Sequence, residues 1–319
     1  MAADVAVLAG GLSLEREVSL RSGHRVTSAL GELGHTTRLL DIDDRLVQTL
    51  SATPADLVFL TVHGATGEDG SIQSLLELLG LPYTGSDTLA SALAWDKPVF
   101  KGLCRREGLP TPDWVTVSAP AVRDLGAGPA LAGAMERLGG PVFVKPAQGG
   151  ASMGVRPVDV ADELAPAVLA AFSYHDVALL ERAVQGAEVA VSLVAGEPLP
   201  PVEIQPKQGR YDYAARYTPG ATEFHAPARL EEATLARCRE VAAAAVELVG
   251  CRHVARADLM VDADGTPWLL ELDTCPGMTE TSLLPLAAQA AGLGFSELCG
   301  RIAEAALADA EVTPVGTSG

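Results

Sequence analysis

The 319-residue sequence is poor in cations, has no close pairs of cysteines and contains no long apolar run. Its 23 lysines and arginines stand against 41 acidic residues, a net charge of −18, and the cations form no run along the chain. A surface that binds nucleic acid or an anionic membrane needs a concentrated basic patch. We therefore expect neither partner, although a nucleotide could bind where a few cations meet.

The five cysteines have neither the spacing of zinc ligands nor that of a small disulfide framework. This pattern favours free thiols in a reducing cytoplasm. No basic segment precedes the short apolar stretch near the N-terminus, so we expect no signal peptide. No apolar run reaches about 20 residues, the length that crosses a bilayer. We expect a soluble, cytoplasmic protein whose length allows a large core and two or three domains.

The N-terminal part alternates short apolar strands with helical stretches. Residues 5–8 and 57–62 predict buried strands, and residues 15–33 and 71–79 predict helices. Strands that alternate with helices are typical of a parallel sheet. We therefore predict a small α/β domain at residues 1–86.

Beyond residue 86 the chain predicts two α+β parts, at residues 87–182 and 183–319. The expected elements of the first part are helices over 87–108 with a break at residues 96–98, strands at 114–117, 141–145 and 154–158, a helix near 160–172, and an edge strand at 177–181. Those of the second part are strands at 188–194 and 201–204, a helix over 231–249, and a hairpin at 256–273. The aromatic and polar stretch at 205–224 is too long for an ordinary connection and predicts a functional loop.

The predicted hairpin carries three carboxylates and an arginine at alternate positions. A turn centred on residues 264–265 pairs Asp258 with Glu271. The same register pairs Arg256 with Asp273, and all four side chains share one face because strand side chains alternate. Opposed like charges need a counter-charge, and Mg²⁺ is typically bound by carboxylates together with substrate phosphates. The face is interpreted either as a magnesium site or as a solvated surface on which Arg256 neutralises the acids.

A glycine-rich loop follows Lys145 at the end of a predicted strand. Glycines at positions 149, 150 and 154 permit backbone conformations in which N–H groups converge on an oxyanion, as nucleotide phosphates require. The loop matches neither the Walker pattern nor the dinucleotide fingerprint. A plain hairpin turn is the alternative interpretation.

Four further segments place polar side chains where a ligand could bind. His63 and Glu68 lie in a glycine-rich turn after a predicted strand, where open α/β sheets bind ligands; a structural turn is the alternative. Glu15 opens a helix and could merely complement its dipole. Ser282 is expected to cap a helix whose N-terminus could also attract a carboxylate. Three tyrosines and an arginine within residues 211–217 suit a mobile lid, or a loop pinned by tyrosine packing.

Taken in this order, the segments resemble the D-alanine–D-alanine ligases of the ATP-grasp superfamily, from about Val5 to Ala308. The markers are Leu-Glu-Arg-Glu-Val-Ser-Leu at 14–20, Val-His-Gly at 62–64, Gly-Glu-Asp-Gly at 67–70, Leu-Pro-Tyr-Thr-Gly-Ser at 81–86, Ser-Ala-Leu at 91–93, Asp-Lys at 96–97, Tyr-Asp-Tyr at 211–213 and Pro-Gly-Met-Thr at 276–279. The resemblance implies an ATP-grasp fold with an N-terminal Rossmann-like domain at 1–86, a central subdomain at 87–182, and a C-terminal subdomain at 183–319 that holds the metal site and the lid loop.

The family resemblance also implies an activity. ATP would phosphorylate the carboxylate of one D-alanine, and the amine of a second would attack the acyl phosphate, giving D-alanyl-D-alanine for peptidoglycan precursors. The implied cofactor is a pair of Mg²⁺ ions, with Mn²⁺ as an alternative, and family members are commonly homodimers. Two alternatives remain open: a related amino-acid ligase of a specialised or resistance pathway, and a nucleotide-binding regulator that has lost catalysis.

By the same resemblance, individual residues acquire expected roles. The catalytic residues would be Glu15, Ser152, Tyr217 and Arg256. Residues that bind the amino acids would be Glu15, His63, Arg256, Gly277, Ser282 and Leu283. Residues that bind ATP would be Lys97, Lys145, Gly150, Ser152, Glu181, Val184, Glu188 and Arg216. The metal ligands would be Asp258, Glu271 and Asp273.

Some of these positions depart from the family pattern. Ala151 stands where the family usually has a serine, so the hydroxyl link between Glu15 and the lid residue Tyr217 is expected to be lost. Asp273 replaces the usual asparagine and adds a negative charge to the metal site. Arg216 replaces the usual lysine and keeps the charge with a different geometry. Ala151 and Asp273 are where altered specificity or drug sensitivity is expected.

Overall fold

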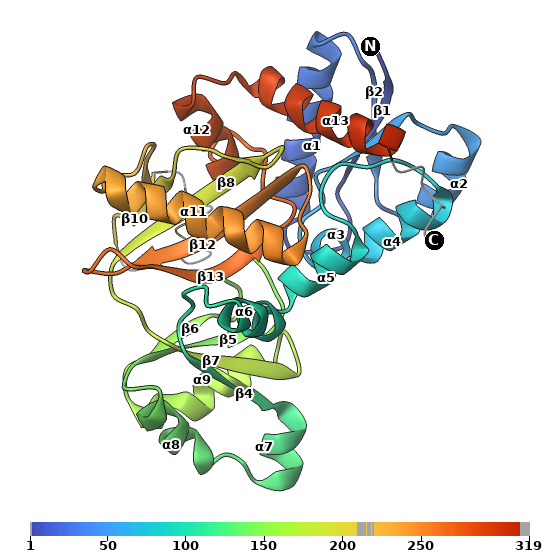
Figure 1. Cartoon of the computed structure of the whole chain (residues 1–319). Helices are drawn as coiled ribbons and strands as arrows, with labels where there is room; N and C mark the ends of the chain where they lie inside the picture. The colour runs from blue at the N-terminus through green and yellow to red at the C-terminus, as the bar shows by residue number, and fades with distance from the viewer. Residues whose placement is uncertain (1, 209–214, 216–217, 219, 313–319) are drawn as a thin grey trace.

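The computed structural model describes residues 2–208, 215, 218 and 220–312, and within them the strands form three sheets (Figure 1). The predicted lid residues Tyr211, Tyr213, Arg216 and Tyr217 lie outside the described residues. Each sheet belongs to a different stretch of the chain, and the helices lie between and around the sheets.

The first sheet is parallel, with strand order β2–β1–β3, as the alternation of strands and helices predicted. Its elements are β1 (Asp4–Ala9), α1 (Arg16–Glu32), β2 (Thr36–Asp41), α2 (Leu46–Ala52), β3 (Leu57–Leu60), α3 (Ala65–Glu68) and α4 (Ser71–Leu79). Buried parallel strands form near-continuous apolar runs, which made β1 and β3 recognisable. The edge strand β2 is mixed in polarity and half-exposed, so the sequence analysis missed it together with α2.

Two capped helices connect this sheet to the next part of the chain. They are α5 (Thr88–Trp95) and α6 (Lys97–Arg106). Asp87 caps the first by accepting the N–H of Ala90 at 2.8 Å, and Asp96 caps the second by accepting that of Val99 at 3.0 Å. The predicted break at Asp96 is therefore the start of α6, which places Lys97 at the N-terminus of that helix and on its buried face.

The central sheet is antiparallel, with order β4–β7–β5–β6. Its elements are β4 (Trp114–Ser118), α7 (Ala119–Leu125), α8 (Ala130–Arg137), β5 (Val142–Pro146), β6 (Arg156–Val158), α9 (Leu164–Ala171) and β7 (Val177–Arg182). The prediction that residues 177–181 form an edge strand is wrong, because β7 lies between β4 and β5. The short helices α7 and α8 were not predicted, because α7 buries no residue and α8 spans only two turns.

The largest sheet has order β11–β10–β8–β12–β13, with β9 paired to β8. Its elements are β8 (Ala187–Val194), β9 (Glu197–Pro198), β10 (Val202–Pro206), β11 (Thr222–His225), α11 (Glu232–Val249), β12 (Val254–Val261) and β13 (Pro267–Asp273). Apolar residues of α11 and α6, including Cys238 and Phe100, pack against one face of this sheet. On the opposite face, Ala190 and Val194 of β8 share a second core with residues of the C-terminal helices.

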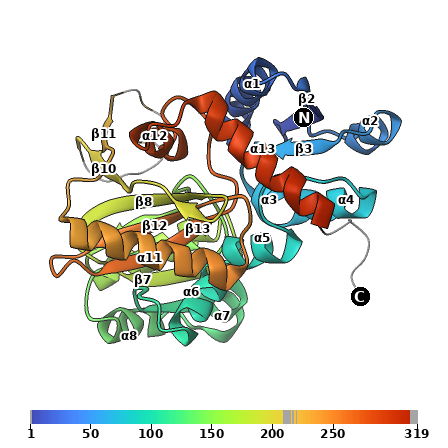
Figure 2. The same cartoon turned by 45° about the horizontal axis from the view of Figure 1, so that its top comes forward.

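The last two helices return to the first sheet. Helix α12 (Leu283–Ala290) packs on β8, and α13 (Phe295–Val312) lies beside α1 and β3 (Figures 1 and 2). Leu298 and Ile302 of α13 share a buried core with Val5 and Val7 of β1. The end of the described chain thus covers the N-terminal sheet. Among the described residues, no helix combines the length and apolar character needed to cross a bilayer.

Candidate active site

The acidic hairpin has the predicted pairs but a different turn. Asp258 lies opposite Glu271, and Arg256 lies opposite Asp273. Beyond Asp258 the register shifts by one residue, so that Leu259 faces Leu269 and Leu270 is extra. The predicted turn centre at residues 264–265 is therefore wrong. A β-bulge compensates for the different turn and restores the predicted pairs.

The turn itself is organised by Asp262 rather than by a two-residue loop. Its Oδ1 accepts the backbone N–H groups of Asp264 at 3.0 Å and Thr266 at 2.9 Å. Its Oδ2 accepts the indole N–H of Trp268 at 2.7 Å. These hydrogen bonds lower the pKa of Asp262, the bond from Trp268 most of all.

Cations neutralise the acids of the hairpin face. Arg256 donates from Nε and Nη2 to Asp258 at 2.7 and 2.8 Å, and its Nη1 lies 2.8 Å from Asp273 Oδ2. Lys97 Nζ lies 3.2 Å from Glu271 Oε2. The ion pairs match the alternative interpretation of this face, but Arg256 and Asp258 are buried rather than solvated. Within the described ranges no group of three acid, histidine or cysteine side chains is arranged to hold a metal ion.

The glycine-rich loop connects β5 to β6 and lies close to Glu15 and Glu68 from the N-terminal part of the chain. Lys97 Nζ donates to the carbonyl of Gly149 at 2.7 Å. Ala151 and Ser152 have φ angles of 50° and 55°, a left-handed conformation that is strained for non-glycine residues. A Cβ atom added to Gly150 would lie 3.0 Å from Glu15 Oε2. The loop therefore brings its backbone close to a carboxylate that lies far away along the chain.

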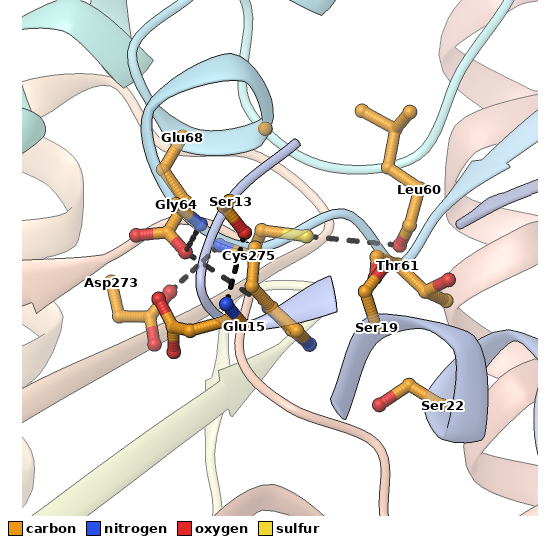
Figure 3. A network of polar contacts seen from close by, with 12 residues as sticks. Ser13, Glu15, Ser19, Ser22, Leu60, Thr61, Gly64, Glu68, Asp273 and Cys275 are labelled. Atoms are coloured by element: carbon orange, nitrogen blue, oxygen red, sulfur yellow. Dashed lines mark hydrogen bonds and ion pairs between the residues drawn. The ribbon is translucent and has the colours of Figure 1, made fainter. Parts of the chain in front are cut away.

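Three carboxyl groups meet beside this loop: Glu15, Glu68 and Asp273 (Figure 3). Burial raises the pKa of Glu68 well above its usual value, and the charges of Asp273 and Glu15 raise it further. The N–H of Gly64 donates to Glu68 Oε1 at 2.9 Å and opposes that shift. The sequence placed Glu68 in a turn where a ligand could bind but gave it no role among the expected catalytic, binding or metal residues. Its proximity to His63 in a glycine-rich turn after a strand was the available signal.

The first cavity, of about 340 Å³, collects the residues expected to bind the amino acids. Its walls include Glu15, His63, Arg256, Gly277, Ser282 and Leu283. A Cβ atom at Gly277 would lie 2.7 Å from Ser282 Oγ and 4.0 Å from His63 Nε2. His63 Nε2 is buried and has no hydrogen-bond partner among the described residues. It is consequently available to a ligand.

Ser282 occupies the N-cap position of α12, but its side chain does not cap the helix. The hydroxyl oxygen instead accepts the N–H of Thr279 at 3.0 Å and lies 2.8 Å from Thr279 Oγ1. The predicted capping hydrogen bond is therefore wrong. The hydroxyl is held at the cavity wall by the turn that precedes the helix.

The second cavity, of about 680 Å³, lies between the central and the largest sheets. It collects the residues expected to bind ATP, apart from Arg216, which lies outside the described residues: Lys97, Lys145, Gly150, Ser152, Glu181, Val184 and Glu188. Phe143, Met260 and Leu270 add apolar walls suited to a flat heterocyclic base, and sequence reasoning missed them. Asp258 and Glu271 line the same cavity.

Lys97, Gly149, Gly150 and Glu271 line both cavities, which therefore adjoin. A nucleotide-sized cavity that two sheets enclose, with lysines and a glycine-rich loop at one end, defines a nucleotide-binding enzyme of the ATP-grasp fold. The end of this cavity that carries the lysines and the glycine-rich loop faces the smaller cavity.

Comparisons with known proteins identify the family. The family model described as "D-ala D-ala ligase C-terminus" matches residues 103–304, and the one described as "D-ala D-ala ligase N-terminus" matches residues 46–86. The chain belongs to the D-alanine–D-alanine ligase family. It is 45% identical to the D-alanine–D-alanine ligase of Anaeromyxobacter sp. (strain K) over 302 residues. This alignment covers 95% of this chain and 96% of the relative. The ligase of Synechococcus sp. (strain JA-3-3Ab) is 43% identical over 99% of this chain and 97% of its own.

Solved structures support the same assignment. The D-alanine–D-alanine ligase of Bacillus anthracis superposes with a TM-score of 0.85 at 32% identity, covering 98% of this chain and 99% of the other. The same enzyme complexed with ATP superposes with a TM-score of 0.83 at 30% identity and the same coverage. The predicted fold class and family are confirmed.

Proposed function

We propose that the protein is an ATP-dependent ligase that joins two D-alanines into D-alanyl-D-alanine, releasing ADP and phosphate, for peptidoglycan precursors. The observation that carries the proposal is the junction of the two cavities at Lys97 and Glu271. A phosphoryl group held by the nucleotide cavity would there reach an amino-acid carboxylate in the smaller one. The named activity of the family relatives supports this substrate.

In this proposal the first D-alanine lies between the N-terminal domain and the hairpin. Glu15, which is buried against the glycine-rich loop, would hold its ammonium group. His63 Nε2, which has no partner among the described residues, would donate to its carboxylate. One carboxylate oxygen would attack the γ-phosphorus of ATP, and ADP would leave. Lys97 and Lys145, both on the wall of the nucleotide cavity, would hold the phosphates.

The second step needs a place for negative charge on the attacked carbonyl. The amine of the second D-alanine would attack the acyl phosphate, and phosphate would leave from the tetrahedral intermediate. Arg256 would stabilise that oxyanion because its buried guanidinium keeps a positive charge; its pKa is raised, against the effect of burial, by Asp258 and Asp273. The backbone N–H of Gly277 would add a donor, and Ser282 and Leu283 would position the second substrate.

The remaining catalytic assignments are part of the same proposal. Ser152 lines the nucleotide cavity, where its hydroxyl would contact the phosphates. Arg216 and Tyr217 would cover the reacting groups from the lid loop.

Asp258, Glu271 and Asp273 fit Mg²⁺ by donor chemistry, because all three are hard oxygen ligands from one face of a hairpin. These three residues would hold the metal, in exchange for part of their present pairing with Arg256 and Lys97. When bound, Mg²⁺, or Mn²⁺ in its place, would neutralise charge on the phosphate oxygens. Two such ions are proposed.

We also propose the division of the chain at residues 1–86, 87–182 and 183–319, a homodimeric assembly and a cytoplasmic location. The three sheets fall one into each of these ranges, which supports the division. The described cysteines are free thiols, and ATP as a substrate suits the compartment that supplies it.

The test measures phosphate release from ATP and Mg²⁺ with D-alanine as donor. D-Alanine, D-serine, D-lactate and L-alanine are compared as acceptors, and the products are identified by mass spectrometry. We expect release with D-alanine and a product of the mass of its dipeptide. A different preferred acceptor would indicate a ligase of altered specificity. Release that needs no amino acid would contradict a ligase, and silence with every acceptor would favour a nucleotide-binding regulator.

A further inference from the structure

Lys101 is fully buried, yet it is missing from the described residues that line the two cavities. It lies in α6, directly behind the wall of the nucleotide cavity. Its Nζ is 2.7 Å from Glu181 Oε2 and 2.6 Å from Thr111 Oγ1. Burying an ammonium group is costly unless partners compensate it, so a lysine in this position calls for an explanation beyond packing.

The Thr111 contact links Lys101 to the hairpin strand. Thr111 Oγ1 donates to the carbonyl of Leu269 at 2.9 Å, so it accepts from Lys101 Nζ. Leu269 directly precedes Leu270, which lines the nucleotide cavity. Lys101 is thus held between β7 of the central sheet and β13 of the largest sheet, the two sheets that enclose the cavity.

Glu181 is held by two ammonium groups, one on each carboxylate oxygen. Lys101 Nζ contacts Oε2, and Lys145 Nζ donates to Oε1. Burial favours the neutral acid, but Lys145 and Lys101 outweigh it and lower the pKa of Glu181. A carboxylate that keeps its charge can accept hydrogen bonds but has no proton to donate.

We propose that Lys101 is a positioning residue for nucleobase selection, which holds Glu181 as a fixed, ionised acceptor facing the base. An ionised acceptor would favour a base with an exocyclic amino group at that edge, as in adenine. A base with a carbonyl oxygen at the same place would meet the carboxylate with like partial charge and no proton between them. The inference rests on the proposed function, because it takes Glu181 as a residue that contacts the base.

The experiment compares ATP with inosine triphosphate, in which a carbonyl replaces the 6-amino group. The kcat and KM of both nucleotides are measured with saturating D-alanine for the wild type, Lys101→Met and Arg105→Met. Arg105 is the matched control: it lies in the same helix and, like Lys101, near the Trp114 ring, but pairs with exposed Asp113 and does not contact Glu181.

For Lys101→Met we expect the KM for ATP to rise about tenfold, the preference for ATP over inosine triphosphate to fall about tenfold, and kcat to change less than about threefold. Arg105→Met should keep the wild-type preference. Lys101→Arg, which retains the positive charge, should restore most of the preference. A change in the ratio of the KM values for ATP and inosine triphosphate, with kcat nearly unchanged, would not result from a loss of packing alone.

The inference is overturned if Lys101→Met keeps the wild-type nucleotide preference, including the case in which it lowers thermal stability or kcat. Should that variant not fold, Lys101→Gln removes the charge while keeping a donor for Thr111, and the same loss of preference is expected. Calorimetric binding of both nucleotides separates the two proposals. A wild type that binds ATP in preference but forms no dipeptide would refute the ligase and leave the role of Lys101 standing.

Discussion

Arg256 Nη1 lies 2.8 Å from Asp273 Oδ2 across the β12–β13 pair. The carboxylate that replaces the usual asparagine of the family is thus held by the arginine that is proposed to stabilise the oxyanion. Asp273→Asn would keep an oxygen donor for Mg²⁺ but remove its charge. Because the charge of the ligands sets metal affinity, we expect the Mg²⁺ concentration for half-maximal activity to rise about three- to tenfold. Activity at saturating Mg²⁺ should change less than about twofold.

The measurement is ligase activity as a function of Mg²⁺ concentration. Glu280→Gln is the control, because Glu280 is exposed and pairs with Arg25 outside the proposed metal ligands. An Asp273→Asn enzyme with the Mg²⁺ dependence of the wild type would remove Asp273 from the proposed metal ligands.

Gly150 should be required for space rather than for chain flexibility, because the glycine-rich loop touches Glu15 there. A Cβ atom at position 150 would lie 3.0 Å from Glu15 Oε2, so Gly150→Ala must displace that carboxylate. We expect the KM for D-alanine to rise about tenfold, since the ammonium of the first substrate loses its partner. Steady-state kinetics with varied D-alanine measures this.

Gly128→Ala is the matched control, because nothing lies within 4 Å of a Cβ atom there and no left-handed φ is required. Its kinetics should equal those of the wild type. Equal KM values for D-alanine in Gly150→Ala and the wild type would show that displacing Glu15 does not weaken substrate binding. This result would contradict its proposed role of holding the ammonium group of the first D-alanine.

His253 should make the protein less stable in mild acid. Its Nδ1 accepts the N–H of Gly85 at 3.1 Å, and its Nε2 lies 2.9 Å from Asp309 Oδ2. Burial lowers the pKa of His253 from its usual 6.5, so between the lowered pKa and 6.5 the unfolded chain binds more protons. The free energy of unfolding should therefore fall as the pH drops below 6.5.

Urea unfolding from about pH 5 to about pH 8 measures this slope, which for one proton is at most about 1.4 kcal/mol per pH unit. His253→Asn should reduce the slope, and asparagine tolerates the left-handed φ of 57° at this position. His24→Asn, at an exposed position, should not. The opposite sign, a stability that rises on acidification and depends on His253, would contradict the neutral imidazole.

Phe100 anchors α6 in the core beneath the largest sheet and is fully buried. Phe100→Ala would leave a cavity that the neighbours fill only in part, and we expect it to cost about 3–5 kcal/mol of unfolding free energy. The neighbouring Val99 is 43% exposed, and Val99→Ala should cost less than about 1 kcal/mol. Denaturant unfolding compares the two, and similar losses would place Phe100 outside the cooperative core.

Local features of the sequence anticipated many elements at close to their true bounds. Helix α4 spans Ser71–Leu79 as predicted, because left-handed glycines at positions 70 and 80 delimit it. The division between α5 and α6 was equally visible, since Asp96 can accept the first free N–H of a new helix. Elements without such local marks were missed, among them the polar edge strand β2 and the alanine-rich α8.

Features that depend on pairing between distant parts of the chain could not be predicted from local patterns. The apolar pattern of residues 177–182 is compatible with either an edge or a central strand. Their place between β4 and β5 depends on partners that are distant in sequence. The bulge at Leu270 is likewise invisible in a pattern of alternation. Burial raises the pKa of Glu68, and the carboxylates of Asp273 and Glu15, which are far away along the chain, raise it further.

By itself, the sequence determined the kinds of elements, the pairs on the acidic hairpin, and the family with its expected binding residues, because these are written in local spacing and short motifs. The tertiary structure alone decided that the two cavities meet at Lys97 and Glu271, that Lys97 pairs with this acid of the hairpin, and that Lys101 stands behind Glu181. Distances between charges on α6 and on the strands of two sheets depend on how these elements pack, and no local pattern in a chain encodes that packing.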